Sequence, residues 1–153
     1  SFDPITLGHM DIIRRTAACF DQVDVCVSPN AEKKGQMFTP AQKLKLEEAA
    51  VLELSNVTAE LYDGLLSDYA AERKATAIVR GIRTQSDFDT EYQQAMVNRG
   101  LHPGLETLLL PADPAYVYLS STVAREMIHY HQPLEKYLPK AILPLIRDWT
   151  EKR

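Results

Sequence analysis

Short apolar segments alternate with segments of helical periodicity along this chain. Runs rich in aliphatic and β-branched residues at 23–27, 57–61, 77–79 and 106–110 predict short buried strands. Between them, apolar residues recur every three or four positions, as on helices that bury one face. Strands that alternate with helices are typical of a parallel sheet covered on both faces. The pattern therefore predicts an α/β fold with a Rossmann-like open parallel sheet and right-handed crossovers.

Capping residues and breakers indicate where the helices begin and end. Thr39, Pro40 and Gln42 combine a threonine cap, a proline in the first turn and a glutamine at the third position. Ser86 is the expected cap of a later helix, and Gly100 is its expected stop. Helices are expected after Thr6, over about 40–54, over 65–74, over 87–100, from 120 to about 130, and from 139 onward.

Composition and charge narrow the class of protein. The length of 153 residues predicts a single domain, 1–153, with a real core. Its 17 basic and 21 acidic residues give a net charge of −4, which argues against a general nucleic-acid binder. Cys19 and Cys26 have no metal or redox spacing and are expected to be core thiols in a reducing, cytoplasmic setting. No membrane-spanning run or signal peptide is visible.

The first nine residues form the strongest candidate for chemistry. Asp3-Pro4 is a turn pair, and Gly8 allows another group to approach the backbone closely. His9 follows in the first turn of a helix, where free N–H groups and the helix dipole favour an anion. These features predict a phosphate site. The alternative is a helix cap followed by a surface histidine.

A phosphate-binding turn of this kind usually follows a buried strand. The sequence begins inside the turn, so we expect one further strand before Ser1. With that strand, the predicted sheet has about five strands.

Four polar clusters follow predicted strands: residues 1–9, Lys33-Lys34, the segment 80–83 and Ser120-Ser121-Thr122. Ligands of open parallel sheets bind beyond the carboxyl ends of the strands, so these clusters should meet at one rim. Each cluster alone is common on protein surfaces, but together they supply the cations, hydroxyls and helix N-termini of a polyphosphate site. The chain has no P-loop or Gly-x-Gly-x-x-Gly motif, no cysteine–histidine pair and no metal cluster. Positioning and charge stabilisation are therefore the expected chemistry.

In these segments the chain resembles the phosphopantetheine adenylyltransferases, nucleotidyltransferases with a T/H-x-G-H motif. The matching segments are 1–9, 33–34, 63–66, 79–83, 86–88, 91, 98–99 and 118–123. The resemblance implies transfer of the adenylyl group of ATP to 4′-phosphopantetheine, with release of pyrophosphate and dephospho-coenzyme A. It also implies Mg²⁺ bound with ATP and a homohexamer.

The resemblance further implies roles for individual residues. His9, Lys33 and Arg83 would be catalytic, His9 by stabilising charge on the α-phosphate. Lys34 is the alternative to Lys33, because the lysine loop is slightly long. The acceptor would contact Ser1, Lys33, Leu66 and Arg80. ATP would contact Ser1, Phe2, His9, Gly81, Ile82, Arg83, Glu91, Tyr116, Val117, Tyr118, Leu119, Ser120, Ser121 and Thr122.

Two other functions remain open at this point. One is a related enzyme of the superfamily, a cytidylyltransferase or a nicotinate-mononucleotide adenylyltransferase. The segment 80–83 followed by Glu91 favours phosphopantetheine over these substrates. The other is a nucleotide-binding protein without activity, which would bind ATP and release no pyrophosphate.

Overall fold

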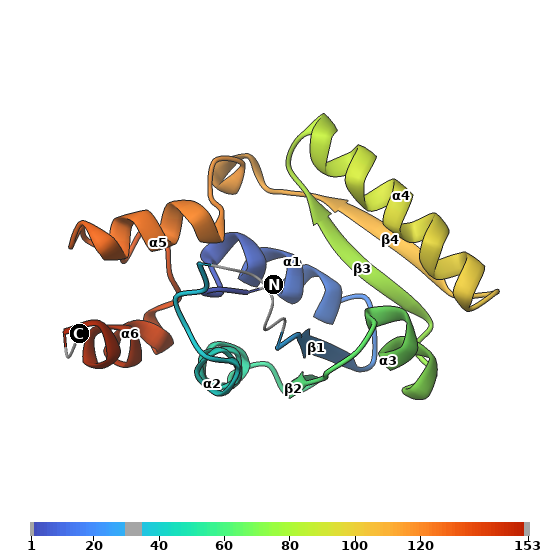
Figure 1. Ribbon diagram of the computed structural model, residues 1–153, viewed down its shortest axis with the longest axis horizontal. Coiled ribbons are helices and arrows are strands. Elements are labelled where there is room, and N and C mark those ends of the chain that lie inside the picture. Colours follow the sequence, from blue (N-terminus) through green and yellow to red (C-terminus); the bar gives the residue numbers. More distant parts are fainter. Residues whose placement is uncertain (1, 30–34, 152–153) are drawn as a thin grey trace.

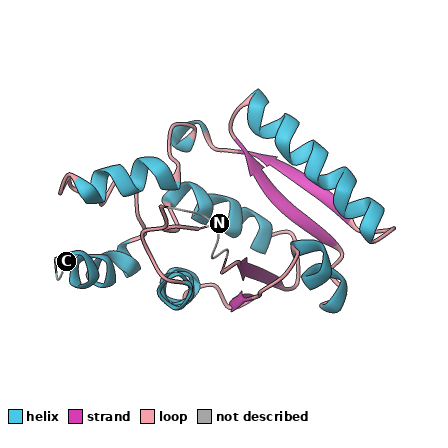
Figure 2. Cartoon of the chain, viewed as in Figure 1, coloured by secondary structure: helices cyan, strands magenta, loops and turns pink. Residues whose placement is uncertain are grey.

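The structure is a computed structural model that describes residues 2–29 and 35–151. Its strands and helices alternate, which confirms the α/β class (Figures 1 and 2). No helix in this part of the chain is long and apolar enough to cross a membrane. The elements are α1 (Leu7–Ala17), β1 (Val23–Val27), α2 (Pro40–Val51), β2 (Val57–Leu61), α3 (Leu66–Glu72), β3 (Ala77–Ile82), α4 (Gln85–Leu101), β4 (Glu106–Pro111), η1 (Pro114–Tyr116), α5 (Ser121–His129), η2 (Lys140–Ile142) and α6 (Leu143–Glu151).

The strands form two parallel pairs. β1 pairs with β2 from Val23↔Val57 onward, and β3 pairs with β4 from Ala77↔Glu106 onward. The expectation of one sheet of about five strands is therefore wrong for the described residues, which form two two-stranded sheets. β1 and β3 share no ladder, and α1 contacts both of them, so it links the two pairs (Figure 1). The strand expected before Ser1 lies outside this sequence and stays a prediction.

The main hydrophobic core joins the β1–β2 pair to α1, α2, α5 and α6. Ile5, Leu46, Ala124 and Ile146 are fully buried there. The helices α5 and α6 lie on the side of the molecule away from β3 and β4 (Figure 1). A smaller cluster beneath α3 contains Ile78 of β3. The end of β3 lies against α1, where Gly81 packs beside Ile12 at the junction of the two strand pairs.

β3 is longer than the apolar pattern predicted. The strand was expected to stop at Val79, but it continues through the arginine–glycine segment to Ile82. Arg80 pairs with Leu109 and Gly81 with Leu110 of β4. Backbone hydrogen bonds between strands do not depend on the polarity of the side chains. The pattern of apolar residues therefore does not show how far a strand continues. Arg80 is consequently held on a strand and not on a free loop.

Some boundaries predicted from single residues are also wrong. Thr84, not Ser86, caps α4, because its hydroxyl accepts the backbone N–H of Asp87 at 3.1 Å. Gly100 lies inside this helix, which continues to Leu101. Cys19 follows α1 and is exposed, so it is not a core thiol. The two helix boundaries share a cause, because several residues nearby could serve as a cap or a stop and packing selects one.

Candidate active site

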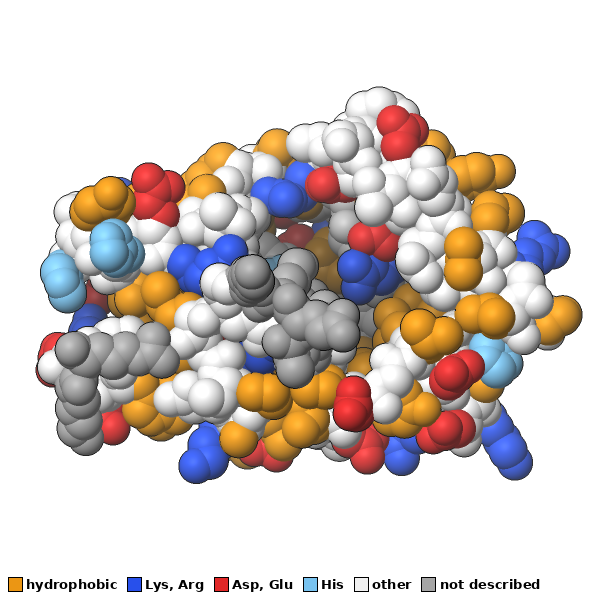
Figure 3. Space-filling model, in the orientation of Figure 1, with side chains coloured by type: hydrophobic (Ala, Val, Ile, Leu, Met, Phe, Trp, Pro, Cys, Tyr) orange, Lys and Arg blue, Asp and Glu red, His pale blue; other side chains and the backbone are white. Residues whose placement is uncertain are grey.

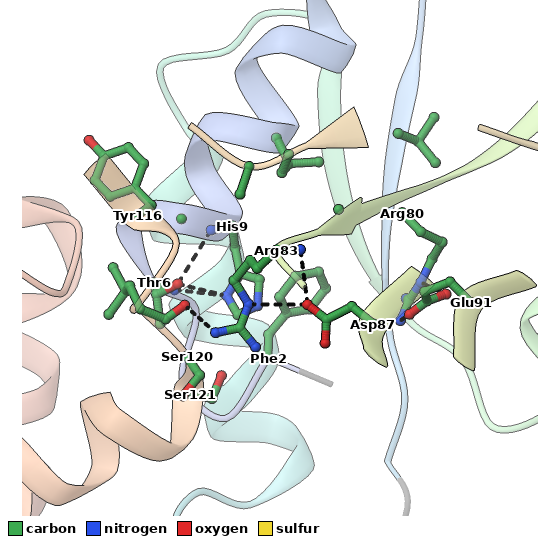
Figure 4. Close-up of a pocket in the computed structure, with 16 residues that line it drawn as sticks. Phe2, Thr6, His9, Arg80, Arg83, Asp87, Glu91, Tyr116, Ser120 and Ser121 are labelled. Atoms are coloured by element: carbon green, nitrogen blue, oxygen red, sulfur yellow. Dashed lines mark hydrogen bonds and ion pairs between the residues drawn. The ribbon is translucent and has the colours of Figure 1, made fainter. Parts of the chain in front are cut away.

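A cavity of about 280 Å³ opens where the first turn, the end of β3, α4 and the start of α5 meet. In Figure 3 a hollow opens on the face shown, and basic side chains border it. The polar side chains around the cavity come from segments far apart in the sequence (Figure 4). The residues lining it include Phe2, Thr6, Gly8, His9, Arg80, Gly81, Arg83, Asp87, Glu91, Tyr116, Leu119, Ser120 and Ser121.

His9 is fixed by a capping box at the start of α1. The Thr6 hydroxyl accepts the backbone N–H of His9 at 3.3 Å, and the Thr6 backbone N–H donates to His9 Nδ1 at 3.0 Å. The ring of Phe2 contacts the imidazole edge-on, with 4.9 Å between ring centroids. The ring therefore has one orientation, set by its own helix cap.

His9 is neutral near pH 7. Burial, together with the positive charges around the ring, including those of Arg80 and Arg83, lowers its pKa from 6.5 to about 3. Because Nδ1 accepts a backbone N–H, the proton of the neutral ring is on Nε2. His9 can thus donate one hydrogen bond in the cavity without carrying a charge.

Two arginines at the end of β3 face two carboxylates of α4 (Figure 4). Arg80 donates to both oxygens of Glu91, from Nε and Nη2, each at 2.9 Å. Asp87 accepts the backbone N–H of Arg83 at 2.9 Å and lies 3.6 Å from its Nε. The Nη1 atom of Arg83 also donates to the carbonyl of Leu119 at 3.2 Å. Both guanidinium groups are therefore held in place by contacts within the protein.

The start of α5 completes the cavity wall. The Ser120 hydroxyl caps this helix by accepting the backbone N–H of Val123 at 3.2 Å. The Ser121 hydroxyl donates to the carbonyl of Pro4 at 2.8 Å, which ties α5 to the first turn. An N-terminus of a helix presents free N–H groups and a positive dipole end. The cavity thus has the N-terminal ends of α1 and α5 at its border.

One glycine, Gly81, allows the close packing that this arrangement requires. A Cβ atom at Gly81 would lie 2.9 Å from Cγ1 of Ile12, so any other residue there would force Ile12 or the backbone to shift. A Cβ atom at Gly8 would lie 3.4 Å from Cβ of Tyr116, an ordinary contact distance, so packing at that position does not require a glycine. Gly81 therefore sets the approach of α1 to β3, and the arginines and His9 depend on that approach.

Asp3 anchors the first turn from beneath the cavity. It is buried, and its carboxylate accepts the backbone N–H groups of Met37 at 2.9 Å and Phe38 at 3.0 Å. Arg125 of α5 donates to the Asp3 carbonyl at 2.7 Å and lies 3.6 Å from its carboxylate. One buried side chain thereby links the turn, the segment before α2 and α5.

The structure places most of the predicted site residues around this cavity, but not all of them. Ser1, Lys33 and Lys34 lie outside the described residues. Five others do not line the cavity: Leu66, Ile82, Val117, Tyr118 and Thr122. Val117 and Tyr118 are exposed around the turn after η1, and the Thr122 hydroxyl instead accepts a hydrogen bond from Arg125. Their contacts with a ligand stay predictions.

Sequence reasoning overlooked Asp87 and the anchoring role of Asp3. Asp87 and Glu91 are four residues apart, so they share one face of α4. That spacing, next to two arginines, is the signal that could have identified the pair. No comparable signal exists for Asp3, because its partners Met37 and Phe38 are 34 and 35 residues away.

The comparisons with known proteins agree with this geometry. The cytidylyltransferase-like family model matches residues 1–127. The fold, the cavity and this match define a cytidylyltransferase-like nucleotidyltransferase.

Proteins named phosphopantetheine adenylyltransferase are similar over nearly the whole chain. The protein from Shouchella clausii is 39% identical over 148 residues, which cover 97% of this chain and 92% of that relative. The protein from Finegoldia magna is 42% identical, with coverages of 97% and 91%. The protein from Heliobacterium modesticaldum is 42% identical over 143 residues, with coverages of 94% and 84%. The chain belongs to the phosphopantetheine adenylyltransferase family.

Proposed function

We propose that this protein transfers the adenylyl group of ATP to 4′-phosphopantetheine, forming dephospho-coenzyme A and pyrophosphate. The observation that carries the proposal is one cavity in which a neutral histidine, two arginines and two helix N-termini meet, in a chain of this family. A phosphate oxygen of the acceptor attacks the α-phosphorus of ATP, and the bond from that phosphorus to the β-phosphate oxygen breaks. The acceptor is already an anion, so the reaction needs no strong general base.

His9 would act on the α-phosphate. Its Nε2–H donates to an oxygen whose negative charge and geometry change as the five-coordinate transition state forms. A fixed donor in an enclosed site stabilises such a state because little reorganisation is needed during the reaction. The capping box with Thr6 supplies that fixation.

The cations would separate the two anionic substrates. Arg80, with Lys33, would bind the acceptor phosphate, and Arg83 would bind ATP. The triphosphate would lie against the N-terminus of α5 at Ser120 and Ser121, where free N–H groups favour negative charge. These contacts offset the repulsion that otherwise keeps two phosphate groups apart.

Mg²⁺ would enter as the counter-ion of ATP. The described residues contain no group of three or more His, Cys, Asp and Glu side chains that could hold a metal ion. Mg²⁺ commonly keeps several waters and binds through substrate phosphates. This mode suits the cavity, whose carboxylates Asp87 and Glu91 already face arginines.

We also propose a cytoplasmic homohexamer. Phe88, Tyr92 and Met96 follow each other at four-residue spacing on α4 and are 40%, 53% and 45% exposed. An apolar stripe of this kind is a candidate contact between subunits. Light scattering after size-exclusion chromatography measures the mass, and a monomer at working concentration would contradict the hexamer.

The proposed compartment rests on the two cysteines. Cys19 and Cys26 are both free thiols, which suits a reducing compartment such as the cytoplasm.

A pyrophosphate-release assay tests the activity. The purified protein with Mg²⁺, ATP and 4′-phosphopantetheine should release pyrophosphate and form dephospho-coenzyme A in equal amounts. Parallel reactions contain CTP in place of ATP, or nicotinate mononucleotide in place of the acceptor, and these should be much slower. Binding of ATP without pyrophosphate release from any acceptor would instead indicate a nucleotide-binding protein without activity.

A further inference from the structure

Two carboxylates lie beside a cavity proposed for two anions, and this placement requires an explanation. Asp87 and Glu91 both line the cavity from the same face of α4 (Figure 4). A carboxylate that directly faced a phosphate would repel it. Each of these carboxylates is instead paired with one arginine of the β3 end. Their effect on substrates should therefore pass through the arginines.

The contact between Arg80 and Glu91 uses only one edge of the guanidinium group. Glu91 accepts from Nε and Nη2, and Nη1 of Arg80 makes no hydrogen bond to the described residues. A guanidinium group has five N–H donors in a rigid plane, so the second edge can bind a phosphate bidentately. The side chain of Arg80 is 41% exposed and that of Glu91 only 16%. The carboxylate thus lies deeper, and the arginine is the member of the pair that a ligand can reach.

The contact between Arg83 and Asp87 has a different form. Asp87 accepts the backbone N–H of Arg83, and on the other side Nη1 of Arg83 donates to the Leu119 carbonyl. Arg83 therefore spans from α4 to the segment that enters α5. This position is next to the helix N-terminus proposed for the triphosphate, whereas Arg80 and Glu91 lie at the other side of the site (Figure 4).

We propose that Glu91 and Asp87 are positioning residues with separate targets: Glu91 acts on the acceptor phosphate through Arg80, and Asp87 acts on ATP through Arg83. This inference rests on the proposed function and reassigns Glu91, which the family resemblance links to ATP. The four-residue spacing on α4 places the two carboxylates one helical turn apart, and each arginine pairs with a different carboxylate. The helix thereby orients two cations toward two different substrates.

Carboxylate-to-amide variants test the inference. Glu91→Gln keeps the shape but replaces one acceptor oxygen with an N–H₂ group that opposes an arginine N–H. It should raise the KM for 4′-phosphopantetheine by about tenfold, the scale of one lost charge-assisted hydrogen bond, and leave the KM for ATP within about twofold. Asp87→Asn should raise the KM for ATP more than that for the acceptor. Asp89→Asn is the matched control, because Asp89 is exposed on α4, does not line the cavity and accepts a hydrogen bond from Gln85.

A double variant separates positioning from direct contact. In an Arg80→Ala background, Glu91→Gln should cause no further rise in the acceptor KM, because its route of action is gone. Glu91→Asp, which keeps the charge, should retain more acceptor affinity than Glu91→Gln does. Melting curves for each variant establish that it folds, and titration calorimetry with each substrate repeats the comparison without turnover.

The outcomes distinguish this inference from the proposed function. The inference is wrong, while the activity stands, if Glu91→Gln raises the KM for ATP more than that for the acceptor. It is also wrong if Glu91→Gln raises the acceptor KM by the same factor in the Arg80→Ala background as in the wild type. If the wild-type protein releases no pyrophosphate and calorimetry detects no binding of 4′-phosphopantetheine, both fail. Selective loss of acceptor binding in Glu91→Gln and of ATP binding in Asp87→Asn supports the inference.

Discussion

Replacing His9 should separate its structural role from its chemical role. Its Nδ1 atom accepts a hydrogen bond in the helix cap, whereas its Nε2–H can donate to a ligand. In His9→Ala, the backbone N–H of the buried Thr6 loses its acceptor at Nδ1. An unsatisfied buried donor costs about 1–2 kcal/mol. For a protein of this size that loss lowers Tm by about 4 °C. The loss of the Nε2–H donor should lower kcat by roughly 10²–10³-fold, with little change in ATP affinity.

Two further variants at this position assign each effect. The chain already contains a capping box with glutamine at the third position, in which Thr39 N donates to Gln42 Oε1 at 3.0 Å. His9→Gln should therefore restore Tm, and its amide N–H₂ should recover part of kcat. His9→Glu should also restore the cap, but it has no donor and adds a negative charge, so kcat should stay at or below that of His9→Ala.

Steady-state kinetics and a melting curve on each of the three variants distinguish the donor role of His9 from its capping role. Equal kcat values for His9→Gln and His9→Glu would refute the donor role. A kcat near that of the wild type in His9→Ala would refute it as well, and would leave His9 as a capping residue only. If kcat followed Tm through the series, the loss of rate would be a folding effect.

The other predictions concern the supports of the site. Asp3→Ala removes the acceptor of the Met37 and Phe38 N–H groups, so it should lower the free energy of unfolding by about 3 kcal/mol. Urea denaturation measures this loss, and an unchanged urea midpoint would contradict the anchoring role. Gly81→Ala should cost about 1–3 kcal/mol and lower activity, because its Cβ meets Ile12; a variant with native Tm and native rate would show that α1 can move.

The neutral His9 also makes stability depend on pH. Its folded pKa is about 3 and its ordinary value is 6.5, so its contribution is complete above pH 6.5 and is lost as the pH falls toward 3. Between pH 7 and pH 5 the loss is at most about 2 kcal/mol. Burial raises the pKa of Glu47, which acts in the opposite direction, so the difference between wild type and His9→Gln isolates His9. The unfolding free energy of both proteins is measured in urea at several pH values. Equal changes with pH in the two proteins would contradict this reasoning.

The sequence by itself determined the local structure and the motifs. The strands at 57–61 and 23–27 have the predicted bounds, and Thr39 caps the helix that it was expected to cap. The helices expected after Thr6 and from 120 begin at Leu7 and Ser121. Apolar periodicity and caps act between residues a few positions apart, so they can be read from the chain alone. The phosphate motifs are equally local, and they were sufficient for the family resemblance.

Only the tertiary structure decided how these pieces pair. The division of the strands into two pairs, the continuation of β3 through Arg80 and the anchoring of Met37 by Asp3 all depend on backbone partners distant in sequence. The neutral state of His9 depends on burial and on charges brought close by folding. The partners of the arginines, Asp87 and Glu91, likewise come from the next element and not from the motif itself. Hydrogen bonds and charge interactions act over a few ångströms in space, and the positions that come that close are set by the packing of the whole fold.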